Sequence, residues 1–174
     1  MPNDMKERFV KGLLFRDFLD GVQENRDLWD RIFQQAHTPP IPSSMARQIN
    51  RRWHLLAVVE DWCMDSANTL PWVSRLADSA QNLDLRVVRK GENPDLMENH
   101  LTDGSEAIPV FLILDQDFQE VDWWGPRPAG LKAFFQEELE DHPEEVRLAG
   151  LRGWYARDQG HGVLQELVAL LGDL

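Results

Sequence analysis

The sequence predicts an α/β protein in which a βαβ unit is followed by an antiparallel hairpin, with helices on the faces of one sheet. Two short apolar runs, at residues 55–59 and 110–114, contain no polar residue, which is typical of strands buried on both faces. A helical pattern separates the first run from a second strand at 83–88, and a turn joins the last run to a hairpin partner at 120–123. At 174 residues, this order favours one domain.

Residues 1–52 are predicted to form an N-terminal helical extension packed on the core. Apolar side chains recur at helical spacing over residues 5–22 and again over 25–36. The segment Pro39-Pro40-Ile41-Pro42 then ends helical structure, because proline lacks the N–H that a helix needs. The apolar faces of these helices are too large to remain in water, so we expect them to cover the sheet.

Residues 53–128 hold the predicted core, and residues 129–174 the C-terminal helices of the same compact domain. Within the core, helices are expected over 64–80 and 94–101. The tail reads as three helices, at 129–140, 143–156 and 161–171. Acidic residues gather around His142-Pro143 and form either a docking patch or, as charge runs usually do, a solvated corner.

The composition limits the classes of function. The chain has 18 Lys and Arg against 30 Asp and Glu, a formal net charge of −12, and a pI of about 4.7. A surface this acidic argues against binding to nucleic acid or to anionic lipid. The N-terminus is too polar for a signal peptide, and no apolar run approaches the roughly 18 residues that span a bilayer. We therefore expect a soluble, cytoplasmic protein with no nucleic-acid or membrane partner.

Cys63 is the only cysteine, which excludes an intramolecular disulfide, a CxxC redox pair and a cysteine-based zinc site. It follows the first predicted strand and directly precedes a helix, where unpaired N–H groups and the helix dipole favour a thiolate. Farther along the chain, Ile108-Pro109 stands just before the third strand, and a proline there often marks a special peptide bond. A lone cysteine is otherwise most often a small buried apolar residue.

These features together resemble the thioredoxin family. The matching residues are Trp62-Cys63 after a strand, Pro71 in the following helix, Ile108-Pro109 before an antiparallel strand and Gly125 after the last strand. The resemblance covers residues 50–127 and implies a thioredoxin-like fold with helical extensions at both ends. The stretches 60–66 and 124–128 also look like a bacterial subgroup of thioredoxin-like proteins, here with a single-cysteine CxxS motif.

The resemblance also implies roles for individual residues. In the family the proline is cis and lies against the reactive cysteine, so the expected catalytic residues are Cys63, Ser66 and Pro109. The expected substrate-binding residues are Trp62, Met64, Asp65 and Ile108. Ser66 replaces the second cysteine of the family, so one molecule alone cannot reduce a disulfide with two thiols. Ala57 stands where many members carry a buried acid that relays protons.

The local charges around Cys63 act in opposite directions on its pKa. The helix N-terminus and a hydrogen bond from Ser66 lower it, whereas Asp61 and Asp65 raise it by repulsion and Met64 by desolvation. We expect the dipole and the hydrogen bonds to prevail narrowly and to leave a moderately reactive thiol.

Other residues have two interpretations each. Trp123-Trp124 is either a ligand platform or ordinary strand packing. Arg127 clamps a carboxylate, pairs with Asp65 or is simply solvated. The five histidines show no metal-binding spacing, so no metal site is expected, and the sequence has neither a glycine-rich phosphate loop nor a Gly-x-Ser-x-Gly motif.

Two functions fit this sequence. In the first, the chain is a monothiol oxidoreductase whose Cys63 attacks a protein or small-thiol mixed disulfide, with no cofactor and with glutathione as a possible external thiol. In the second, it is a non-catalytic binding module in which Cys63 is incidental. The reactivity of Cys63 separates the two.

Overall fold

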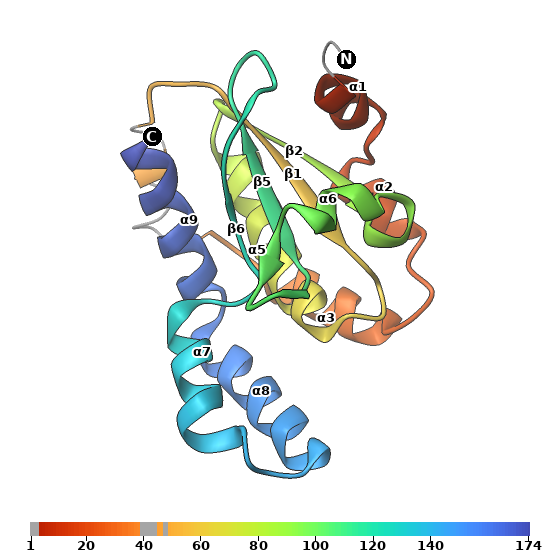
Figure 1. The fold of residues 1–174 in the computed structure, drawn as a ribbon, viewed down its shortest axis with the longest axis vertical. Coiled ribbons are helices and arrows are strands. Elements are labelled where there is room, and N and C mark those ends of the chain that lie inside the picture. Colours follow the sequence, from red (N-terminus) through yellow and green to blue (C-terminus); the bar gives the residue numbers. More distant parts are fainter. Residues whose placement is uncertain (1–3, 39–44, 47–48) are drawn as a thin grey trace.

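The computed structural model describes residues 4–38, 45–46 and 49–174, and its centre is a four-stranded mixed sheet in the order β2-β1-β5-β6. The central strand, β1 (Trp53–Val59), pairs in parallel with β2 (Leu83–Arg89) and antiparallel with β5 (Val110–Leu114). The far edge of β5 carries β6 (Glu120–Trp124). The sheet therefore combines a parallel pair with an antiparallel hairpin, which confirms the predicted fold class (Figure 1).

The side chains of β1 alternate between two apolar cores. Leu55, Ala57 and Val59 belong to the core on one face, and Leu56 and Val58 to the core on the other. All seven residues of the strand are buried. This is why the sequence shows an unbroken apolar run here instead of alternation.

Helices cover both faces of the sheet. On the first face the core is completed by α2 (Phe15–Asp20), α3 (Arg26–Gln35), α5 (Met64–Ser79) and α9 (His161–Asp173). On the second face it is completed by α1 (Asp4–Lys11) and α6 (Pro94–Glu98). A 3-10 turn, η1 (Lys90–Glu92), links β2 to α6, and the two short strands β3 (Leu101–Thr102) and β4 (Ser105–Glu106) form a small separate hairpin.

The C-terminal helices begin at the end of the sheet that β1 points to. Helix α7 (Ala129–Phe134) continues into a π-helical turn, η2 (Phe135–Leu139), and α8 (Glu144–Asp158) folds back beside them. A third apolar cluster joins these elements, and they extend beyond the end of the sheet (Figure 1).

Two predicted helices are shorter than expected. The helix expected over 5–22 is broken between α1 and α2, where Leu13 exchanges two backbone hydrogen bonds with Val87 of β2, at 2.9 and 2.8 Å. Gly12 permits this approach, because a Cβ there would lie 3.0 Å from the Cβ of Arg86. The helix expected over 94–101 ends at Glu98, because the chain turns into β3. The proline segment at 39–42 lies outside the described residues.

The unfolding of a Phe18→Ala variant tests whether residues 1–52, 53–128 and 129–174 fold as one domain. Phe18 is 1% exposed and packs edge-on against Trp29, with 5.2 Å between ring centroids. Phe18→Ala should lower the free energy of unfolding by about 3–5 kcal/mol, because it leaves a cavity in the core beside the sheet. We expect one denaturant transition at a lower midpoint, followed by circular dichroism and tryptophan fluorescence.

Two separate transitions would contradict the one-domain prediction. The control is Val10→Ala on α1, whose side chain is 62% exposed. That variant should change stability by no more than about 0.5 kcal/mol.

Candidate functional site

Cys63 caps the N-terminus of α5. The loop from β1 delivers it there, with the Cys63 N–H donating to the Glu60 carbonyl at 3.2 Å and the Cys63 carbonyl accepting from Ala67 at 3.1 Å. The sulfur itself accepts a hydrogen bond from the backbone N–H of Ser66, with 3.4 Å between N and Sγ. A sulfur in this position receives the partial positive charge of the helix terminus.

The loop before β5 meets the same sulfur from the opposite side. The Cys63 thiol donates to the Ile108 carbonyl, with 3.6 Å between Sγ and oxygen, and the Ile108–Pro109 peptide bond is cis. The register of the sheet causes this meeting, because Val58 near the end of β1 lies opposite Val110 at the start of β5. Ile108 and Pro109 are both buried.

Gly125 brings a third loop to the site. It follows β6, has a φ of +147°, and a Cβ at this position would lie 2.2 Å from the carbonyl oxygen of Pro109. Only glycine fits such a close approach at a positive φ. The end of β6 therefore packs directly on the proline loop, which explains why a glycine stands after the last strand.

The structure brings all seven expected site residues to the N-terminus of α5 or the proline loop, and they differ in exposure. Cys63, Ser66, Ile108 and Pro109 are buried, and Met64 and Asp65 are partly buried in the first turn of α5. Trp62 is 51% exposed. These positions describe geometry, and the roles of the residues stay predictions.

Burial raises the pKa of the Cys63 thiol above its ordinary value. Only 9% of the residue is exposed, so the charged thiolate loses most of its hydration. The Ser66 hydroxyl and N–H lower the pKa, and Asp65 raises it through its charge, but burial outweighs the hydrogen bonds. The expectation that the dipole and the hydrogen bonds would prevail was therefore wrong in direction, because sequence patterns do not reveal how deeply a side chain is buried.

Asp61 is turned away from the cysteine, contrary to its expected repulsive role. Its carboxylate accepts from the backbone N–H groups of Gln23 and Glu24, at 3.0 and 3.3 Å, and lies 3.5 Å from Arg89. Burial acts to raise the pKa of Asp61, but these three partners prevail and lower it. Asp61 thus ties the loop before Cys63 to the segment between α2 and α3.

Asp65 is held by residues from two other elements. Arg127, between β6 and α7, donates from Nε and Nη2 to the two carboxylate oxygens, at 2.9 and 3.0 Å. The hydroxyl of Tyr155 on α8 donates to Asp65 Oδ1 at 2.5 Å. Of the alternatives for Arg127, the pair with Asp65 is therefore the one that forms. Sequence reasoning missed Tyr155, because nothing in the chain relates it to a residue 90 positions earlier.

A cleft of about 710 Å³ opens beside the cysteine. Cys63 and Ile108 line it, together with the half-exposed Trp62. The β3–β4 hairpin, α7 and η2 complete the lining, with Glu106, Lys132, Phe135 and Gln136 among the residues that they contribute. Sites for small molecules commonly enclose 300–1,000 Å³.

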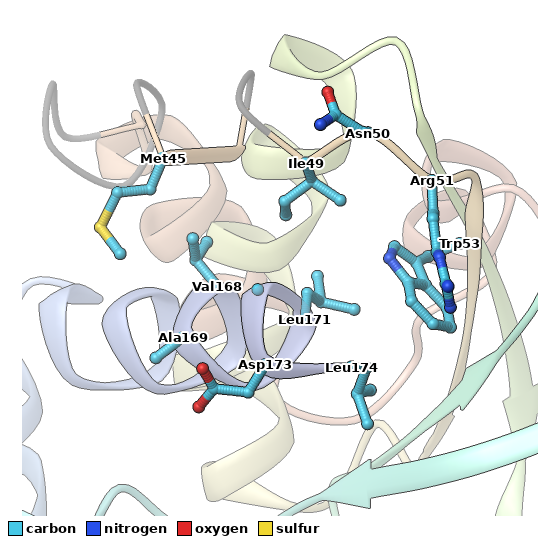
Figure 2. Close-up of a pocket in the computed structure, with 11 residues that line it drawn as sticks. Met45, Ile49, Asn50, Arg51, Trp53, Val168, Ala169, Leu171, Asp173 and Leu174 are labelled. Atoms are coloured by element: carbon cyan, nitrogen blue, oxygen red, sulfur yellow. The ribbon is translucent and has the colours of Figure 1, made fainter.

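A second hollow, of about 510 Å³, lies at the other end of β1 (Figure 2). It is bounded by Trp53, Ile49 and the last turns of α9, and it contains none of the expected site residues. Trp123 and Trp124, at the end of β6, line neither hollow. Trp124 is buried in the core, and Trp123 packs edge-on against His100, which supports strand packing for both.

Two classes of feature are absent from the described residues. Within 4–38, 45–46 and 49–174, no three His, Cys, Asp or Glu side chains are grouped to hold a metal ion. No helix in this same part of the chain has the length and apolar character needed to cross a membrane.

Asp61→Asn should lower the free energy of unfolding at neutral pH by about 1–3 kcal/mol, since a charged hydrogen-bond acceptor is lost from a buried position. The pKa of Asp61 is lower in the folded state, so its stabilisation is present above the unfolded value of about 3.9 and is lost as the pH falls through the folded value. Denaturant titrations at several pH values measure the difference between wild type and variant.

The difference should be largest near neutral pH and disappear in acid. A constant difference at all pH values would contradict this origin. Asp17→Asn, on the exposed side of α2, serves as the control and should show little effect at any pH.

Gly125→Ala should destabilise the protein by at least about 2 kcal/mol, because the added Cβ forces the β6 end away from Pro109 and strains a positive φ. The melting temperature and the alkylation rate of Cys63 measure the effect on fold and site. Gly91→Ala is the control, because a Cβ there meets nothing within 4 Å. Equal melting temperatures for the two variants would show that the close approach is unimportant.

Comparison with known proteins agrees with this geometry. A family model for thioredoxin matches residues 12–140. No curated protein matches the chain significantly. A protein of unknown function from Pseudomonas aeruginosa has a solved structure with a TM-score of 0.74 and 22% identity, covering 97% of this chain and 96% of that one. An HIV epitope-scaffold gives 0.73 and 23%, covering 97% and 98%. These two structures support the fold, and, since the family model spans most of the sequence, the chain belongs to the thioredoxin family.

Proposed function

We propose that this chain is a monothiol thiol–disulfide oxidoreductase of the single-cysteine CxxS kind. One observation supports this most directly: the Cys63 sulfur lies at a helix N-terminus, contacts the Ile108 carbonyl and opens onto a cleft of about 710 Å³. A cysteine that served only as a small apolar core residue would be enclosed by other side chains and would not line a cleft. The CxxS pattern and its resemblance to a bacterial subgroup belong to this proposal.

The proposed reaction proceeds in two exchanges. The Cys63 thiolate attacks one sulfur of a mixed disulfide, so that a new disulfide forms on Cys63 and the substrate leaves as a thiolate, which takes up a proton. An external thiolate, such as that of glutathione, then attacks the Cys63 adduct and regenerates the Cys63 thiolate. The substrate leaves as a thiol, the external thiol leaves in a disulfide with the thiol that Cys63 had carried, and no bound cofactor is needed.

The surroundings of the sulfur suit this exchange. Trp62 presents an exposed aromatic face at the edge of the cleft, where the apolar part of a substrate would pack. The cleft accommodates the smaller thiol of a mixed disulfide, and the protein part would remain outside. Ser66 is fully buried, and its hydroxyl lowers the pKa of the Cys63 thiol, as expected of a donor that stabilises the thiolate.

A non-catalytic binding module is the second candidate, and the burial of Cys63 favours it. The sulfur is almost covered, and burial raises the pKa of its thiol, so the nucleophilic thiolate is scarce at neutral pH. In that case the cleft and Trp62 would hold a partner without any reaction at the sulfur.

The test is the intact mass of the folded protein after incubation with oxidised glutathione over a range of pH. We expect one glutathionyl adduct, formed faster as the pH rises, because the raised pKa of Cys63 keeps the thiolate fraction small at neutral pH. Added reduced glutathione should remove the adduct.

Cys63→Ser is the control and should remain unmodified. If the folded wild type also stays unmodified up to about pH 9, the oxidoreductase proposal fails and the binding module takes its place. Circular dichroism at each pH confirms that the protein is still folded.

A further inference from the structure

The Arg127–Asp65 pair is built into the wall of the cysteine site. Asp65 stands in the first turn of α5, two positions after Cys63, and its side chain is 15% exposed. Arg127 meets it with two nearly parallel hydrogen bonds and is itself 23% exposed. Such bidentate pairs are the most directional ion pairs that side chains form. Both residues line the same cleft as the sulfur.

A carboxylate in this place would by itself oppose the chemistry of the cysteine. An unpaired Asp65 would repel a thiolate on Cys63, and partial burial strengthens the repulsion because water screens it poorly. Arg127 offsets part of that negative charge, and the remainder still raises the pKa of the Cys63 thiol. Its guanidinium also lies within electrostatic reach of the Cys63 sulfur.

We propose that Arg127 is a positioning residue for the Cys63 nucleophile. Arg127 offsets the charge of Asp65 beside the sulfur, and Tyr155 of α8 holds the pair in place through its hydrogen bond to Asp65. The inference rests on the proposed function, in which the thiolate of Cys63 is the reacting species. It assigns the C-terminal helices a part in the site, because Tyr155 lies 28 positions beyond Arg127 and belongs to α8.

Tyr155 holds the Arg127–Asp65 pair in place from its buried side. It is 7% exposed, its hydroxyl donates to the same Asp65 oxygen that accepts from Arg127 Nε, and its ring packs with Leu131, Leu139 and Leu151 in the third apolar cluster. Burial, together with the Asp65 charge, raises the pKa of Tyr155 well above its ordinary value, so the hydroxyl stays a donor over the whole working range of pH.

The other charged groups near the cleft are arranged differently. Lys90 is paired with Glu106 at 3.1 Å, and Lys132 and Glu140 lie at the exposed rim. Asp103, on the β3–β4 turn, is also exposed. Asp61 faces Arg89 and the N-terminal extension, as described above. Asp65 and Arg127 are partly buried, line the cleft and interact electrostatically with the Cys63 thiol.

The test measures the rate of Cys63 alkylation against pH with iodoacetamide, a neutral reagent whose own charge does not affect the result. Cys63 is the only cysteine, so intact mass reports this site alone. Arg127→Gln should move the midpoint of the profile up by about one pH unit and slow the reaction below it about three- to tenfold. Arg127→Lys keeps the charge but loses the bidentate geometry, so it should recover part of the rate.

Three further variants separate charge from structure. Asp65→Asn leaves Arg127 unopposed beside the sulfur and should move the midpoint down. Adding Asp65→Asn to Arg127→Gln removes both charges and should reverse most of the slowing. Tyr155→Phe keeps the ring but removes the donor, and should change the profile in the same direction as Arg127→Gln, by less.

Arg8→Gln is the matched control. Arg8 forms a second bidentate pair, with Asp95 at 3.0 and 2.9 Å, and neither of those residues lines the cysteine cleft. This variant should leave the profile unchanged.

If Arg127→Gln gave the profile of wild type, or if the double variant stayed as slow as Arg127→Gln, the inference would be overturned. If Arg127→Gln does not fold, Asp65→Asn alone tests the inference. An unchanged midpoint of the alkylation profile in Asp65→Asn would exclude the charge effect. Failure of wild type to react with oxidised glutathione would instead remove the proposed function, and the alkylation profiles would still decide the role of Arg127.

Discussion

The position of Cys63 depends on the pairing of β1. This strand is buried on both faces and hydrogen-bonded along both edges, so it has no freedom to shift in register. Its antiparallel partner β5 starts beside the place where β1 ends. The loop that leaves β1 and the loop that enters β5 are therefore neighbours, and the contact between Cys63 and the Ile108 carbonyl follows. A shift by one residue in either strand would separate them.

The same burial that fixes the sulfur makes its ionisation harder. A helix N-terminus favours an anion by about 0.3–1 kcal/mol at exposed sites and up to about 2 kcal/mol where partly buried. Enclosing a thiol beneath the proline loop costs its thiolate most of its hydration, and here that cost is the larger effect on the pKa. The burial that fixes the position of the Cys63 sulfur therefore also disfavours its thiolate. Nearby charges and hydrogen-bond donors set how much of the thiolate forms at a given pH.

Sequence patterns predicted the central elements well because those elements are determined locally. The strand Val110–Leu114 was predicted to the residue, and α5 to within one residue of its end. The break before α2 was missed, because Leu13 has good helical spacing and only its partner Val87 on β2 makes it extended. The direction of side chains could not be predicted from the sequence either. Asp61 and Asp65 both flank the cysteine, yet Asp61 faces Arg89 and the N-terminal extension, whereas Asp65 raises the pKa of Cys63.

The two acids beside Cys63 show why the extensions matter to the site. Asp61, two positions before the cysteine, is held by backbone N–H groups of the N-terminal extension and by Arg89. Asp65, two positions after it, is held by Arg127 and by Tyr155 of the C-terminal helices. Each carboxylate carries a charge that would oppose a thiolate, and each is paired with an arginine. Each also connects the cysteine segment to another part of the chain through its hydrogen bonds. The loop before the sulfur and the first turn of α5 after it are therefore each held by a carboxylate that accepts hydrogen bonds from a segment outside the central sheet.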